Sequence, residues 1–206
     1  MEDMRQSNYV FLRGVLAGPP RFSHDNRGVR FYTFPLEVRR LSGVADTLNI
    51  VIREDQAGLV EPQTAEKLFV RGELRSFNNK SGAGPKLIIT VFARELGFDD
   101  GEDENDVELT GTICKPPNLR VTPMGREICD LMLAVNRRYG RSDYLPCIAW
   151  GARAREAGSW QVGQVVVLSG RMQSRIYTKQ LETGSVEKTA YEVSIIDIFP
   201  AEDADT

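Results

Sequence analysis

The sequence predicts an all-β protein made of two tandem five-stranded barrels, each with a short helix between its third and fourth strands. Three observations support this fold class. The chain repeats itself at a distance of 97 residues, each copy consists of short segments in which apolar and polar residues alternate, and an acidic run separates the copies. A repeat of this length is too long for a solenoid unit and indicates two copies of one domain.

The repeat is defined by identical residues at a shift of 97 places, which is Asn105 minus Asn8. The ungapped identities are Asn8 and Asn105, Val10 and Val107, Leu12 and Leu109, Gly14 and Gly111, Pro19 and Pro116, Pro20 and Pro117, Gly28 and Gly125, Leu36 and Leu133, Val38 and Val135, Arg40 and Arg137, Gly43 and Gly140, Asp46 and Asp143, and Leu48 and Leu145. After one inserted residue, Gly72 and Ser76 meet Gly170 and Ser174. Each copy is long enough to bury a core of its own.

The repeat and the acidic run divide the chain into five parts. These are an N-terminal segment (1–7), a first barrel (8–98), an acidic linker (99–105), a second barrel (106–200) and a short acidic tail (201–206). The linker contains the run Asp99-Asp100-Gly101-Glu102-Asp103-Glu104. Such a run buries no apolar surface, so we expect a solvated connection, and its glycine is misplaced for a calcium loop.

The first three strands are clearest in the second copy. Apolar residues alternate at Val107, Leu109 and Ile113 in the first strand, and at Cys129, Leu131, Leu133 and Val135 in the second. The inner face of the third strand carries Leu145, Cys147 and Ala149, which match Leu48, Ile50 and Ile52 of the first copy. Because side chains alternate across a strand, Tyr144, Pro146, Ile148 and Trp150 are expected to point outward together.

The remaining elements complete each barrel. An alanine-rich helix is expected at 152–157, then a strong strand over 165–177 and a last strand over 191–198. Five strands with a helix between the third and fourth form the layout of the oligonucleotide-binding barrel, or OB-fold.

The charge is distributed unevenly. The formal net charge is −3, but residues 8–96 hold 13 Lys and Arg against 9 Asp and Glu, and residues 107–200 hold 12 against 9. Six acidic residues lie in 97–106, and the two chain ends add a net −4. Both barrels are therefore basic, and the overall charge does not argue against a nucleic-acid partner.

Several classes of protein are disfavoured by what the sequence lacks. The three cysteines have no Cys-x-x-Cys spacing and a single histidine to assist them, so neither a disulfide framework nor a metal site is predicted. No apolar run approaches the length of a membrane span, and the polar start is not a signal peptide, so we expect a cytoplasmic protein. No nucleophile, carboxylate cluster or nucleotide loop supports an enzyme, a cofactor or a small-molecule substrate.

The outward face of the second copy combines aromatic rings with arginines. Tyr144 and Trp150 share the outward side of the third strand, and Tyr177 shares that of the fourth with Arg171, Gln173 and Arg175. The connection between the second and third strands adds Tyr139, Arg137, Arg138 and Arg141. Unpaired bases stack on such rings while guanidinium groups contact phosphates, so this face is predicted to bind single-stranded nucleic acid. The alternative is that the rings pack under loops or at a subunit interface.

Five motifs in the second copy resemble the bacterial single-stranded DNA-binding protein family. They are NDVELTG at 105–111, LRVTPMG at 119–125, LAVNRRY at 133–139, PCIAWG at 146–151 and LSGRMQSR at 168–175. The resemblance implies an OB-fold that coats unwound strands during replication, recombination and repair, without catalysis. It also implies base stacking on Tyr139, Tyr144, Trp150 and Tyr177, a homodimer with four barrels whose first-strand edges pair between subunits, and a bacterial, nucleoid-associated location.

The chain departs from that family in two places. Its tail, Ala201-Glu202-Asp203-Ala204-Asp205-Thr206, lacks the long disordered region and the final Pro-Phe pair through which members recruit replication and repair proteins. The acidic linker is a possible substitute that would bind partners or compete with DNA. In the first copy, Ser42, Thr47 and Arg53 replace Tyr139, Tyr144 and Trp150, so its stacking platform is expected to be largely lost.

The sequence therefore predicts a non-catalytic protein that binds and protects single-stranded DNA. Its predicted DNA-binding residues are Tyr139, Tyr144, Trp150, Tyr177, Arg137, Arg138, Arg171 and Arg175 of the second barrel, and Arg53 and Arg75 of the first. The first barrel is expected to contact phosphates weakly or to serve subunit or protein contacts. One alternative is a tandem OB-fold assembly factor of primosome type with weak nucleic-acid binding. RNA is another, because stacking faces accept any base.

Overall fold

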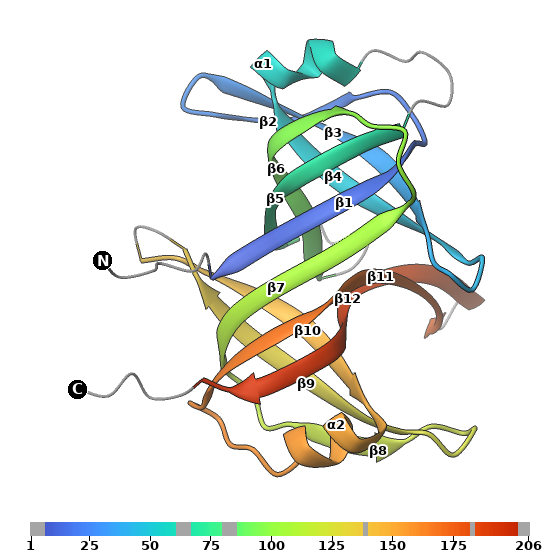
Figure 1. Ribbon diagram of the computed structural model, residues 1–206, viewed down its shortest axis with the longest axis vertical. Coiled ribbons are helices and arrows are strands. Elements are labelled where there is room, and N and C mark those ends of the chain that lie inside the picture. The colour runs from blue at the N-terminus through green and yellow to red at the C-terminus, as the bar shows by residue number, and fades with distance from the viewer. Residues whose placement is uncertain (1–6, 61–66, 80–85, 138–139, 182–183, 202–206) are drawn as a thin grey trace.

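The computed structural model describes residues 7–60, 67–79, 86–137, 140–181 and 184–201. Figure 1 shows two barrels joined along one side, the first half of the chain forming one and the second half the other. Among the described residues, no helix is both long and apolar enough to cross a membrane.

Both halves follow the same order of elements. The first contains β1 (Asn8–Leu16), β2 (Arg21–Asn26), β3 (Val29–Arg39), β4 (Ala45–Arg53), α1 (Glu54–Ala57), the 3-10 turn η1 (Gly58–Val60), β5 (Lys67–Asn78) and β6 (Leu87–Phe98). The second contains β7 (Glu104–Ile113), β8 (Asn118–Val121), β9 (Glu127–Asn136), β10 (Ser142–Trp150), α2 (Gly151–Ala157), β11 (Val165–Leu181) and β12 (Gly184–Pro200).

Five strands close each barrel, which confirms the predicted tandem OB-fold. In the first half, β1 pairs with β3 at one end and with β5 along its length, and β4 pairs in parallel with β6. The second half repeats this closure with β7, β9, β10, β12 and β11. The helix α2 lies between the third and fourth barrel strands, as the alanine-rich segment predicted.

Each half also has a short strand that the sequence analysis did not predict. The strands β2 and β8 pair only with β3 and β9, and all of their side chains are exposed. Strands that bury neither face show no apolar alternation, so the pattern gave no signal for them. The last two strands are also longer than predicted and meet in an extended hairpin.

The predicted inner face of β10 is confirmed, but its outer face is not uniformly exposed. Leu145, Cys147 and Ala149 are buried. Ile148, which was predicted to point outward with Tyr144 and Trp150, is only 5% exposed. Its side chain is covered although its parity is outward, at a position where β10 pairs with both β9 and β12.

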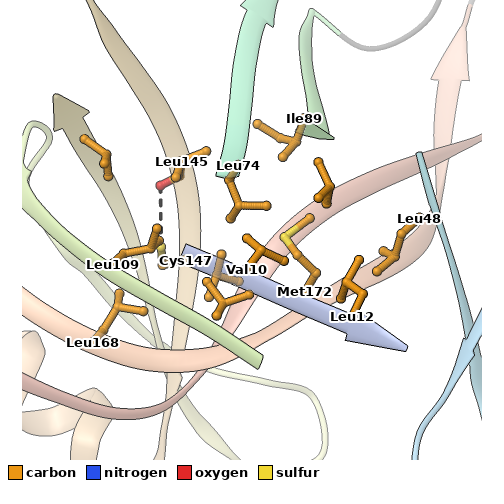
Figure 2. Packing of buried hydrophobic residues seen from close by; sticks show 14 of the residues in the cluster. Val10, Leu12, Leu48, Leu74, Ile89, Leu109, Leu145, Cys147, Leu168 and Met172 are labelled. Carbon is orange, nitrogen blue, oxygen red and sulfur yellow. Dashed lines mark hydrogen bonds between the residues drawn. The ribbon is translucent and has the colours of Figure 1, made fainter. Parts of the chain in front are cut away.

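The two barrels are joined by antiparallel pairing of β1 with β7. Val10 lies opposite Val107, and Asn8 lies opposite Leu109, so equivalent strands meet about an approximate two-fold axis. The expectation that these edges pair between subunits is therefore wrong, because each first strand already has its partner within the chain. The cores are not separate either: buried residues of both halves form one cluster, and Figure 2 shows β1 running through its middle.

The acidic linker is only partly solvated: Asp100 and Glu102 are exposed, but the other acidic residues pair with the first barrel. Arg13 of β1 donates to Asp99 at 2.9 Å and forms an ion pair with Glu104 at 2.8 Å. Asp103 pairs with Lys67 at 2.8 Å and accepts a hydrogen bond from the backbone N–H of Arg39. The linker lies against the first barrel because that barrel is basic, and Glu104 already belongs to β7, two residues before the predicted start of the second barrel.

Candidate nucleic-acid interface

The outer face of β10, β12 and β11 carries half of the predicted site. These strands are neighbours in the sheet, in that order. Ile148 of β10 lies beside Ser194 of β12, which lies opposite Arg171 of β11. Side chains on this row share the outward side, so groups from three strands meet on one surface of the second barrel.

Two aromatic rings stand on β10. Tyr144 is 50% exposed and Trp150 is 38% exposed, although the rest of the strand is largely buried. The indole N–H of Trp150 donates to the Ser194 hydroxyl at 3.2 Å. This hydrogen bond fixes one edge of the ring and leaves part of its surface open, which suits a stacking partner.

The strand β11, which lies beyond β12 in the sheet, supplies the cations. The Arg175 guanidinium carbon lies 5.9 Å from the centre of the Tyr177 ring, and its side chain is 56% exposed. The buried Nε of Arg171 has no hydrogen-bond partner among the described residues. Between them, Gln173 donates to Glu192 at 2.8 Å. Two arginines and one ring therefore alternate along β11, as predicted from the sequence.

The structure does not place the other five predicted residues on this face, and Arg53 is described below with the first barrel. Tyr139 and Arg138 fall outside the described residues. Arg137 and Arg75 both contact the carboxylate of Asp143, which is completely buried. Both arginines therefore lie at the contact between the barrels rather than on the open face of the sheet.

This contact occurs twice, once on each side of the two-fold axis. Asp143 accepts the backbone N–H of Ser76 at 2.6 Å, and Asp46 accepts that of Ser174 at 2.8 Å. Arg40 completes the second site by donating to Asp46 through two nitrogens. We call these two clusters the seam sites. In each seam site a carboxylate of one barrel binds the fourth strand of the other barrel: Asp143 binds β5, and Asp46 binds β11.

The seam also positions the stacking face. The backbone N–H of Tyr144 donates to the Ser76 hydroxyl of the first barrel at 2.7 Å. Tyr144 follows directly on Asp143, so the first barrel fixes the segment from which this ring projects. The repeat contained the signal for the seam, since Arg40, Asp46 and Ser76 are among the residues identical in both copies. Identity alone did not reveal that they contact each other across the axis.

Acid is expected to weaken the seam. Burial alone raises the pKa of Asp46, but hydrogen bonds from Arg40 and Ser174 outweigh it, and the pKa lies below its usual value. A lowered folded-state pKa gives stability that is complete above the unfolded value of about 4 and is lost as the pH falls through the folded value. Urea unfolding should therefore lose more free energy between neutral pH and pH 3 in the parent than in Asp46→Asn. Equal losses in the two proteins would contradict this assignment.

In the first barrel, Arg53 occupies the position of Trp150. It is exposed, and its Nε lies 3.6 Å from the Asp55 carboxylate. Ser42 and Thr47 replace the other two rings, as the repeat indicated. Three further rings were not among the predicted DNA-binding residues: His24 stacks on Phe31, and Phe31 contacts Phe92, on the outer face of this barrel. They stand at positions where the second copy has no rings, so a position-by-position comparison did not find them.

The chain resembles known proteins over its second half in sequence and over its whole length in fold. Residues 104–198 match the model of the single-strand binding protein family. Single-stranded DNA-binding protein B of Bacillus subtilis is 35% identical over 83 residues, which cover 37% of this chain and 74% of that protein. Single-stranded DNA-binding protein 3 of Streptococcus agalactiae is 31% identical over 83 residues, 37% of this chain and 60% of that protein.

The fold has a solved counterpart. The crystal structure of the single-stranded DNA binding protein from Thermus aquaticus superposes with a TM-score of 0.77 at 23% identity, and the match covers 97% of this chain and 95% of the other. The chain spans only 60% of the Streptococcus protein and about half of some other curated relatives. On the match to the Bacillus protein and to the family model, the chain belongs to the single-strand binding protein family.

Proposed function

We propose that this protein binds and protects single-stranded DNA on the outer face of its second barrel, without catalysis. The observation that supports this most directly is the pair of exposed rings on β10, Tyr144 and Trp150, which share the outer face of the sheet with the arginines of β11. Membership of the family and the names of the relatives support the same ligand.

The mechanism combines stacking with charge. Each base stacked on a ring contributes about 1–3 kcal/mol, and any base can stack, so binding is tolerant of sequence. Trp150 is held by Ser194 before DNA arrives, which lowers the entropy lost on stacking. Arg171 and Arg175 contact phosphates along the same strand, and Tyr177 extends the stacking face. Tyr139 and Arg138 lie outside the described residues and are assigned to DNA binding by sequence and family resemblance alone, and Arg53 adds a phosphate contact on the first barrel.

By family resemblance, the protein serves replication, recombination or repair in the bacterial cytoplasm, on unwound nucleoid DNA. It acts as a homodimer with four barrels. An exposed apolar patch supports this assembly, since a second subunit can cover it. It lies on the outer side of the sheet, where the start of β11 pairs with the end of β12, and includes Val165, Val167 and Phe199. A shallow groove on the same face lies where β1 meets β7, and Phe11 and Ile196 line it.

Titration with oligo-dT tests the function. Tryptophan fluorescence should be quenched by a single strand but not by a duplex of the same length, and the affinity should fall as salt rises. Trp160 packs against the core, so quenching would report Trp150. Light scattering of the same samples gives the number of chains in each complex. Absence of binding at low salt would exclude this function and favour a protein-assembly role.

A further inference from the structure

The outer face of the first barrel carries a row of aromatic rings. The imidazole of His24 on β2 stacks on Phe31 of β3, with ring centres 4.7 Å apart and an angle of 8° between the planes. Phe31 contacts Phe92 of β6, with ring centres 6.1 Å apart. These three rings, which we call the first-barrel row, cross from the β2–β3 hairpin to the last strand of the barrel.

The first-barrel row lies next to Arg53, whose equivalent in the second barrel is the aromatic residue Trp150. Phe31 pairs with Arg53, and Arg53 is the repeat equivalent of Trp150. Phe92 pairs with Val51 as Ser194 pairs with Ile148, so Phe92 is the equivalent of the residue that holds the Trp150 indole. The rings have therefore moved from β4 to the strands on either side of it, and an arginine occupies the place between them.

Cations surround the row. The Arg94 guanidinium carbon lies 5.1 Å from the centre of the Phe92 ring, and that of Arg75 lies 5.8 Å from it. Arg94 also pairs with Glu73 at 3.0 Å, and Arg53 with Asp55 at 3.6 Å. Arg53 and Arg94 are more than half exposed. The Arg53–Asp55 pair is exposed on both sides and contributes little, so a phosphate can replace Asp55 at small cost. Glu73 is largely buried but also pairs with Arg75, so it keeps a cation when Arg94 turns to a phosphate.

Core packing does not account for these rings. Every residue of β2 is exposed, so His24 stacks on Phe31 at the surface rather than in the interior. The neighbouring pair Phe22 and Tyr32 differs, because Tyr32 packs against the buried core. Surface rings beside guanidinium groups provide both contacts that a single strand requires, a face for the base and a charge for the phosphate.

We infer that the first barrel binds single-stranded nucleic acid on the first-barrel row, with Arg53 and Arg94 as phosphate contacts. This rests on the proposed function and extends it, since a strand held on the second barrel continues onto a differently placed set of rings on the first. A base stacks on the open face of His24 or replaces it on Phe31. The two barrels then hold successive parts of one strand.

The test uses the full chain with His24→Ala, Phe31→Leu and Phe92→Leu combined, and Phe22→Leu on the same hairpin as the matched control. One OB-fold holds about 4–16 nucleotides, so oligo-dT of about 8 nucleotides occupies the second barrel alone, and about 35 nucleotides reaches both. The triple variant should bind the long oligonucleotide about tenfold more weakly, the loss of one or two stacked bases. It should bind the short one as the parent does, and the control should match the parent on both.

Photo-crosslinking of the parent protein to oligo-dT that carries 5-iodouracil gives a readout independent of how the variant folds. Crosslinks at His24, Phe31 or Phe92 support the inference. Crosslinks on β10 and β11 with none on the first-barrel row, or equal affinity of parent and triple variant for the long strand, would overturn it and leave the proposed function intact. If the parent binds neither oligonucleotide, the proposed function fails and this inference fails with it.

Discussion

Replacing Tyr144 and Trp150 together with alanine should weaken binding of single-stranded DNA by about 100-fold or more. Each ring contributes about 1–3 kcal/mol of stacking, and each 1.4 kcal/mol is a factor of ten in affinity. Both side chains are partly exposed on the same strand, so the loss falls on binding more than on folding. Anisotropy of a fluorescein-labelled oligo-dT measures the change, since the variant lacks the tryptophan that reports quenching.

Phe22→Ala is the control for this double variant. Phe22 is 60% exposed and lies on the first barrel, away from β10. Its removal should leave affinity within a factor of two or so of the parent, the usual range for a surface side chain without a partner in binding. If Phe22→Ala weakened DNA binding as much as the double variant does, the loss would reflect apolar surface in general. The assignment of base stacking to β10 would then be wrong.

Replacing Asp143 with alanine should destabilise the protein by about 3–5 kcal/mol, because the change leaves the largely buried Arg137 without its carboxylate and the backbone N–H of Ser76 without its acceptor. Asp143 is completely buried and accepts hydrogen bonds from Arg137, Arg75 and the backbone of Ser76. The equilibrium free energy of urea unfolding measures the cost. Asp46→Ala should have an effect of the same order at the other seam site.

The matched control is Asp130→Ala, which removes an exposed carboxylate paired with Arg120 at 2.6 Å. An exposed ion pair contributes under about 1 kcal/mol. If Asp143→Ala lowered the free energy of unfolding no more than Asp130→Ala, the seam sites would contribute no more than an exposed ion pair. The pairing of β1 with β7 would then be the main contact between the barrels.

The barrels themselves were predictable because each strand carries its own evidence. Alternation along β10 identifies Cys147 as buried and Trp150 as outward whatever the strand pairs with, and the repeat supplies a second copy that checks the parity. The stacking face followed from the same parity. Local pattern was sufficient wherever the structure is decided by which side of a strand faces the core.

The joining of the barrels was not predictable from such patterns. A first strand looks the same whether its free edge pairs with another subunit or, as here, with β7 of its own chain. Arg137 was predicted to contact DNA because the sequence shows a charge but not the buried carboxylate that it meets. The acidic linker was predicted to be solvated because its partners, Arg13 and Lys67, lie far from it in sequence.

Because β1 pairs with β7 of the same chain, the two halves of this protein can accept different amino-acid substitutions. When two identical subunits meet about an axis, every substitution appears on both sides at once, and a change that suits one side must suit the other. Here the two sides are encoded separately and cannot separate on dilution, because the chain itself holds them together. One half is free to keep its rings on the third barrel strand while the other relocates them, and the axis itself is preserved by the few residues that both halves retain.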